Sequence, residues 1–208
     1  NQDYHHAFIY GEKLFTLNPN IEKLYDTLVY IAAKTKNWNQ LIFISEKAYS
    51  QKIINKEVAN ENKSVAFYEI AKIKSKSYPK DAIRNITKAL NFKNNFPPYV
   101  DLHLQLIENT NNLPLLKKMI KKYWVASPTL IIRKIITKVI TSNNLDNLDF
   151  IYHLIKSNSN YEESKKLLIS FAIKNQNWNV ARETIKGLIG ANPTKEVCLF
   201  MADIELGE

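Results

Sequence analysis

The stretch NWNVARETIKGLIGANPT, residues 177–194, holds the clearest copy of a motif that recurs along the whole chain. The motif consists of apolar or small residues three or four positions apart, followed by a proline: Trp178, Ala181, Ile185, Leu188 and Pro193. Related copies occur upstream at Ala7, Gly11, Leu14 and Pro19; at Trp38, Leu41, Ser45 and Ala48; at Ala82, Ile86 and Ala89; at Leu116, Ile120, Tyr123 and Pro128; and at Leu148, Tyr152 and Ile155. This spacing places the motif residues of each copy on one side of a helix.

The copies recur at a nearly constant interval. Their anchors are residues 7, 41, 82, 116, 148 and 181, so successive copies are 34, 41, 34, 32 and 33 residues apart. A period in this range is typical of stacked helix pairs, and 34 residues is the length of the tetratricopeptide repeat (TPR). One pair cannot bury its apolar stripe alone, so neighbouring pairs stack. We therefore predict an all-α, TPR-like right-handed α-solenoid of about twelve helices: one leading helix, five helix pairs and one trailing helix.

The same periodicity predicts a single TPR-like domain over residues 1–208. In this repeat pattern, the first helix of the chain corresponds to the second helix of a repeat, and the last helix corresponds to the first helix of another repeat. We therefore expect a fragment of a longer protein, with partial repeats at both ends. No stretch of 18 or more residues is both apolar and uncharged, so we expect no transmembrane helix within this sequence. The single Cys198 excludes an intramolecular disulfide.

Local signals refine the repeat pattern. The 41-residue interval predicts an insertion, and we expect the polar residues 51–63 to extend the helix before them and the loop after it. Trp38 and Trp178 each lie between two Asn, and we interpret both as wedges between adjacent helices rather than as ligand-stacking surfaces. Asn111–Asn112 and Asn143–Asn144 predict turns between helices. The alanines of the motif predict close helix approaches at Ala7, Ala48, Ala82, Ala89 and Ala181.

Three segments near the C-terminus match the pattern of a known family. Residues 176–182 read QNWNVAR, residues 193–205 read PTKEVCLFMADIE, and residues 124–128 read WVASP. They resemble the "W..AR" helix, the "PT..VC.LMA.IE" helix and the Trp-x-x-x-Pro segment of alphaproteobacterial HemY-like TPR proteins. The resemblance covers residues 116–208.

The resemblance implies a soluble TPR region tethered to the bacterial inner membrane, with the cytoplasmic face favoured, and an association with haem biosynthesis. It implies no catalytic residues. An unrelated flavin-dependent oxidase shares the family's name, but this sequence has no Gly-rich dinucleotide fingerprint after a strand, so we do not expect that chemistry.

Basic residues are concentrated in one part of the chain. The segment between Glu108 and Asp146 has no acidic residue, although it carries seven of the basic residues of a chain whose net charge is +9. The cluster consists of Lys117, Lys118, Lys121, Lys122, Arg133, Lys134 and Lys138. Like charges four positions apart on a helix repel, so helix stability does not require them. The first interpretation is an ordinary solvated face, the second is contact with an anionic protein segment or membrane surface, and nucleic acid ranks last.

A second candidate site follows from the repeat register. The first helix of each pair should line the concave face of the stack, and its groove positions would be Tyr30, Tyr68, Lys72, Asp101, Gln105, Arg133, Thr137, Lys166 and Ser170. This mixed, mildly basic set would bind an extended peptide or an acidic C-terminus, with Arg133 as a fork for a carboxylate. An ordinary polar lining is an equal alternative.

Signals for catalysis and cofactors are absent from the sequence. No nucleophile elbow or phosphate loop occurs, and His5, His6, His103 and His153 lack metal-ligand spacing. Cys198 lies in an apolar stretch, so we interpret it as buried and inert. We therefore predict a non-enzymatic protein-interaction scaffold without cofactor or metal, with a protein or peptide as its partner. The alternatives are haem or porphyrin handling through His103 or His153, and nucleic-acid binding through the Lys117–Lys138 cluster.

Overall fold

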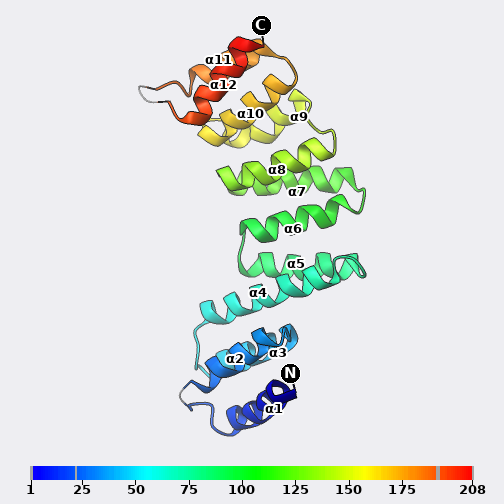
Figure 1. Cartoon of the computed structure of the whole chain (residues 1–208), viewed down its shortest axis with the longest axis vertical. Helices are drawn as coiled ribbons and strands as arrows, with labels where there is room; N and C mark the ends of the chain where they lie inside the picture. Colours follow the sequence, from blue (N-terminus) through cyan, green and yellow to red (C-terminus); the bar gives the residue numbers. More distant parts are fainter. Residues whose placement is uncertain (1, 22, 191–192, 208) are drawn as a thin grey trace. The chain divides into compact units, whose positions relative to one another are not determined.

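The computed structural model describes residues 2–21, 23–190 and 193–207. In these ranges the chain forms twelve α-helices and one short 3₁₀ helix, and no strand (Figure 1). The prediction of an all-α chain of about twelve helices is thus confirmed. The helices are α1 (Gln2–Leu17), α2 (Leu24–Lys34), α3 (Trp38–Ser50), α4 (Lys56–Lys74), α5 (Pro79–Phe92), α6 (Pro97–Glu108), α7 (Leu113–Ala126), α8 (Leu130–Ser142), α9 (Leu148–Ile155), η1 (Lys156–Asn158), α10 (Glu162–Lys174), α11 (Trp178–Lys186) and α12 (Lys195–Leu206).

The chain divides into two compact units. Unit 1 spans Asn1–Leu106 and unit 2 spans Ile107–Glu208. In unit 1, α2 packs against α1 and α3, and α4 packs against α3 and α5. In unit 2, α10 packs against α8, α9, α11 and α12. Within each unit, most of these packing contacts join helices that follow one another along the chain, as expected for a repeat stack. Among the described residues, none of the helices is both long and apolar enough to cross a membrane.

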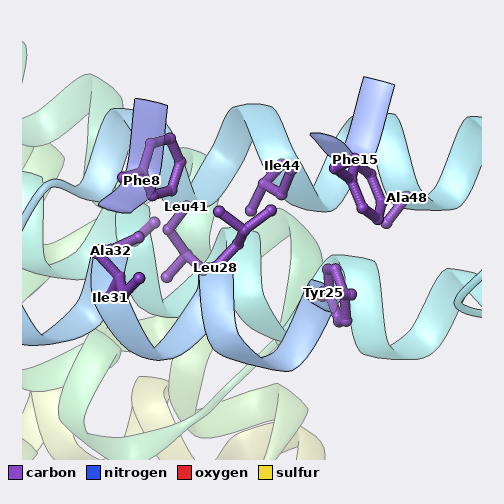
Figure 2. Packing of buried hydrophobic residues seen from close by; sticks show 10 residues of the cluster. Phe8, Phe15, Tyr25, Leu28, Ile31, Ala32, Leu41, Ile44 and Ala48 are labelled. Atoms are coloured by element: carbon purple, nitrogen blue, oxygen red, sulfur yellow. The ribbon is translucent and has the colours of Figure 1, made fainter. Parts of the chain in front are cut away.

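The core of unit 1 shows where the motif register was wrong. The structure exposes Ala7 and Leu14 and buries Phe8 and Phe15 of α1 instead. These phenylalanines face Leu28 and other apolar residues of α2 and α3 (Figure 2). The register shifts by one residue because burying two aromatic rings removes far more apolar surface from water than burying an alanine.

The insertion lengthens α4, not the helix before it. Helix α3 ends at Ser50, and Asn55 caps the next helix by accepting a hydrogen bond from the Val58 amide at 2.9 Å. Residues 56–63 therefore form the first two turns of α4, which has 19 residues. The expectation that residues 51–63 extend the preceding helix is wrong, because the Asn cap starts a new helix inside them.

Several turns between helices contain a residue in the left-handed backbone conformation. Asn111 and Asn144 have φ of 54° and 51°, as the Asn pairs predicted, and Lys36 and Gln176 have φ of 55°. After α2, the Asn37 amide reaches back to the Ala32 carbonyl at 2.9 Å, which closes a Schellman turn. At these helix ends, Asn, Lys or Gln thus adopts the left-handed conformation that glycine usually supplies.

The core of unit 2 confirms most of the last motif copy. Ala181 and Ile185 are buried, and the ring of Trp178 packs directly against the backbone of Gly207. The tryptophan is therefore the wedge that the sequence suggested. In the copy on α9, however, Tyr152 is exposed and Ile151 is buried in its place.

Candidate interaction site

Helix α7 presents two opposite sides. Asn112 caps its start by accepting a hydrogen bond from the Leu115 amide at 3.0 Å. One side of the helix is buried, through Leu116, Ile120, Tyr123 and Trp124, and burial raises the pKa of Tyr123. The other side carries four exposed lysines, which we call the lysine ridge: Lys117, Lys118, Lys121 and Lys122. The apolar motif thus fixes which way the lysines point.

The charge of the lysine ridge is not neutralised by neighbouring carboxylates. Within the described part of the chain, none of its four ammonium groups forms an ion pair. Lys117 lies over the ring of Phe150 on α9, 5.5 Å from its centroid, and Lys122 lies 5.9 Å from the centroid of the Tyr123 ring. Such contacts orient the side chains but leave their charges exposed to solvent. The ridge is therefore a positive surface suited to an anionic partner.

The rest of the predicted basic cluster divides into two kinds of residue. Lys134 and Lys138 are exposed on α8, and neither forms an ion pair with a described residue. Arg133, in contrast, is buried, so its inclusion in a surface patch is wrong. Its guanidinium forms ion pairs with carboxylates of unit 2.

Arg133 lies in what we call the buried ion cluster, with Glu163, Lys166 and Glu196. Its Nε donates to Glu163 at 2.6 Å, and its Nη2 donates to Glu196 at 2.5 Å. Lys166 Nζ lies 3.1 Å from Glu196, 3.7 Å from Glu163 and 2.7 Å from Glu162. The side chains of Arg133 and Lys166 are only 8% and 7% exposed. The cluster joins α8, α10 and α12.

The electrostatics of the buried ion cluster favour its charged form. Glu162 and Glu163 lie in the first turn of α10 and Glu196 in the first turn of α12, where the helix dipole favours negative charge. Burial alone would raise the pKa of Glu196, but hydrogen bonds from Arg133 and Lys166 outweigh it and hold that pKa below its ordinary value. Burial would likewise lower the pKa of Lys166, yet hydrogen bonds to Glu162 and Glu196 raise it. The cluster thus ties the start of α10 and the start of α12 to α8 through charged hydrogen bonds.

The structure distributes the predicted groove residues over both units. Unit 1 holds Tyr30, Tyr68, Lys72, Asp101 and Gln105; unit 2 holds Arg133, Thr137, Lys166 and Ser170.

In unit 1, Tyr30 is exposed, whereas the ring of Tyr68 packs 4.8 Å from that of Tyr99 and Lys72 pairs with Glu69 at 3.0 Å. Asp101 and Gln105 are half-buried on α6.

In unit 2, Thr137 and Ser170 are half-buried, and the Ser170 hydroxyl donates to the Leu167 carbonyl at 2.8 Å. The structure brings Arg133 and Lys166 together, but around carboxylates of this chain. The expected fork for a partner's carboxylate is therefore already occupied.

The potential metal and thiol ligands do not converge. His5, His6 and His153 are exposed, whereas His103 is buried in α6. Cys198 is exposed on α12, so its interpretation as a buried thiol is wrong. Within residues 2–21, 23–190 and 193–207, no three His, Cys, Asp or Glu side chains are grouped as metal ligands.

Sequence reasoning missed two features of the molecule. The first is the set of carboxylates that hold Arg133, and the second is a pocket of about 690 Å³ between α9, α10 and α11. Comparison with protein-family models and with curated proteins found no match for this chain.

Proposed function

We propose that the chain is a non-enzymatic protein-interaction scaffold whose lysine ridge binds an acidic helical segment of a partner protein. The observation that supports this proposal is the run of four exposed lysines on α7, Lys117 to Lys122, that no described carboxylate neutralises. Two exposed apolar residues border the ridge. Leu115 lies one turn before Lys118, and Val125 lies one turn after Lys121. A surface of this kind matches an amphipathic acidic helix.

Nucleic acid fits this surface less well. Binding of single strands uses exposed aromatic rings on which bases stack. The aromatic residues of α7, Tyr123 and Trp124, are buried, so their rings offer no open face beside the ridge. An anionic membrane would need only the charge, at roughly 1 kcal/mol per lysine near the surface. The exposed Leu115 and Val125 favour a partner with its own apolar contacts.

The test uses three anionic probes on the same protein. These are a fluorescent amphipathic helix with Glu on one face and Leu on the other, a 20-nucleotide poly-uridine, and vesicles of phosphatidylserine and phosphatidylcholine. We expect the peptide to bind, and the variant Lys118→Gln/Lys121→Gln/Lys122→Gln to weaken its affinity at least tenfold. A matched control replaces three exposed lysines of unit 1, Lys56, Lys76 and Lys80, by Gln and should change the affinity less than twofold.

The outcomes separate the candidate partners. Tighter binding of poly-uridine or vesicles than of peptide, with the same loss in the ridge variant, would replace the protein partner by nucleic acid or membrane. Equal losses in ridge and control variants would remove the site altogether. Substituting Arg133 or Lys166 is unsuitable here, because both belong to the buried ion cluster and their loss would act through stability.

We also propose the finer identity that the sequence suggested: a right-handed, TPR-like stack related to the HemY-like family, tethered to the bacterial inner membrane and associated with haem biosynthesis. The Trp178 and Pro193 segments support it. The full coding sequence tests the tether, since two apolar spans of about 20 residues ahead of Asn1 would support it. Upstream sequence without such spans would contradict it.

A further inference from the structure

A pocket of about 690 Å³ opens between α9, α10 and α11 of unit 2. We propose that this pocket, which we call the α9–α11 pocket, binds a small organic anion with an apolar body, such as an aliphatic carboxylate or an aryl sulfonate. The lysine ridge of α7 contributes no residue to it. The lining residues that decide its chemistry are Tyr152, Ile155, Lys156, Lys165, Leu168 and Glu183.

The floor of the pocket is apolar. Ile155 of α9 and Leu168 of α10 are buried at its base, and Tyr152 forms a half-open wall. Small-molecule sites are typically clefts of roughly 300–1,000 Å³ with mostly apolar lining and a few polar groups that orient the ligand. Both the volume and the lining of this pocket fall in that class. Its size suits a compact molecule rather than an extended peptide.

The rim of the pocket is positively charged. Lys156 is exposed at one edge, and Lys165 lies at another, where its Nζ donates to the Gly187 carbonyl at 3.3 Å. An ammonium group has three donors, so Lys165 keeps two for a ligand. The only carboxylate in the lining, that of Glu183, is paired with Lys186 at 2.6 Å. Lys156, Lys165 and Lys186 outnumber this one carboxylate, so the charge around the pocket is positive on balance.

Apolar floor and cationic rim together specify the ligand class. A neutral apolar molecule would gain nothing from the charges of Lys156 and Lys165, and a fully polar anion would gain nothing from the apolar floor. A molecule with both an apolar body and one anionic group meets both parts. The lysines lie at the mouth, so the anionic group would face solvent and the apolar body would lie inside.

The test uses two dyes that differ by one charge. The probe 8-anilinonaphthalene-1-sulfonate carries a sulfonate, and N-phenyl-1-naphthylamine has the same ring system without it. We expect saturable binding of the sulfonate dye that decanoate displaces. The variant Lys156→Gln/Lys165→Gln should weaken binding of the sulfonate dye about tenfold and change binding of the neutral dye less than twofold, because only the counter-charge is removed.

Two controls locate the effect. Lys118→Gln/Lys121→Gln removes the same charge from α7 and should leave binding of both dyes within twofold. Leu168→Ala enlarges the floor and should weaken both dyes, with circular dichroism confirming that the variant is folded. Absence of saturable dye binding would overturn the proposal. So would equal losses in the two double-lysine variants, or a neutral dye that is weakened as much as the sulfonate.

Discussion

Replacing Arg133 by Met should destabilise unit 2 by about 3–5 kcal/mol, the range for removing one partner of a buried ion pair. The Arg133 side chain is 8% exposed and holds Glu163 at 2.6 Å and Glu196 on its other side. Met fills a similar apolar space but donates no hydrogen bond. Glu163 is 18% exposed and would keep only Lys166, at 3.7 Å. The cost is therefore a desolvated carboxylate that has lost its hydrogen bond.

The assay is thermal unfolding followed by circular dichroism, with Arg84→Met as matched control. The Arg84 side chain on α5 is 79% exposed and reaches Asp81 at 3.5 Å, so its loss should cost less than about 1 kcal/mol. In a unit of this size 1 kcal/mol shifts Tm by roughly 4–8 °C, so Arg133→Met should lower the Tm of unit 2 by at least about 12 °C. Amide hydrogen exchange in α8 and α10 assigns the change to unit 2.

A double variant examines the cause. Adding Glu196→Gln to Arg133→Met removes one of the two carboxylates that the first change leaves without its guanidinium. The pair should therefore be less destabilising than the sum of the single changes, by about 1–3 kcal/mol. Strict additivity, or a Tm loss no larger than that of Arg84→Met, would refute the reasoning that Arg133 stabilises unit 2 through these partly buried ion pairs.

Three further predictions concern the pKa of Glu196, a left-handed turn residue and a close glycine contact. Because the pKa of Glu196 is lower in the folded chain than its ordinary 4.5, the unfolded chain takes up the proton first, and unit 2 should lose stability as the pH falls through the folded pKa. Urea midpoints measured from pH 6 to pH 3 should decline less in Glu196→Gln. Lys36→Gly should stabilise unit 1 by at most about 1 kcal/mol in the same urea assay, because glycine relieves roughly 1–2 kcal/mol of left-handed strain at the Lys36 φ of 55° but loses about 0.4–1 kcal/mol through the freer unfolded chain. Gly207→Ala should cost about 1–3 kcal/mol in thermal unfolding, since a Cβ there would lie 2.2 Å from the Trp178 ring. Gly190→Ala, which meets only open space, should stay within about 0.5 kcal/mol.

The repeat period predicted the helices well and their faces less well. Motif residues such as Ala48 and Ala181 are buried as expected, because only a small side chain fits where two helices cross closely. In α1 the periodicity fits two registers one residue apart, and the burial of Phe8 and Phe15 selects between them. Spacing alone does not distinguish such registers. The Asn55 cap of α4 was readable in the sequence, since Asn is a preferred first residue before a helix.

The candidate site was predictable where it depends on one helix. The lysine ridge follows from the sequence of α7 alone, because helical spacing places its four lysines on one side and four apolar residues on the opposite side. The role of Arg133 depends on Glu163 and Glu196, which lie 30 and 63 residues further along the chain. These separations are close to one and two repeat periods, but the positions equivalent to Arg133 in the next two motif copies are Lys165 and Cys198, so the register alone does not pair Arg133 with the two glutamates. A count of acidic residues within one segment misses partners supplied by the next repeat.

The size of the electrostatic term limits what the lysine ridge can bind. Its lysines are roughly 6 Å apart along the helix, which is shorter than the Debye length of about 8 Å at physiological ionic strength, so they act as one field. Each exposed ion pair with a partner contributes about 0.2–1 kcal/mol, and four pairs therefore give at most about 4 kcal/mol. This corresponds to a Kd of only about 1 mM before the entropic cost of association. A tighter partner must also cover Leu115 and Val125, because each buried Å² of apolar surface adds roughly 25 cal/mol. The ridge thus selects a segment that is amphipathic as well as acidic, and a purely acidic chain such as poly-glutamate should bind it at least tenfold more weakly than the Glu/Leu helix.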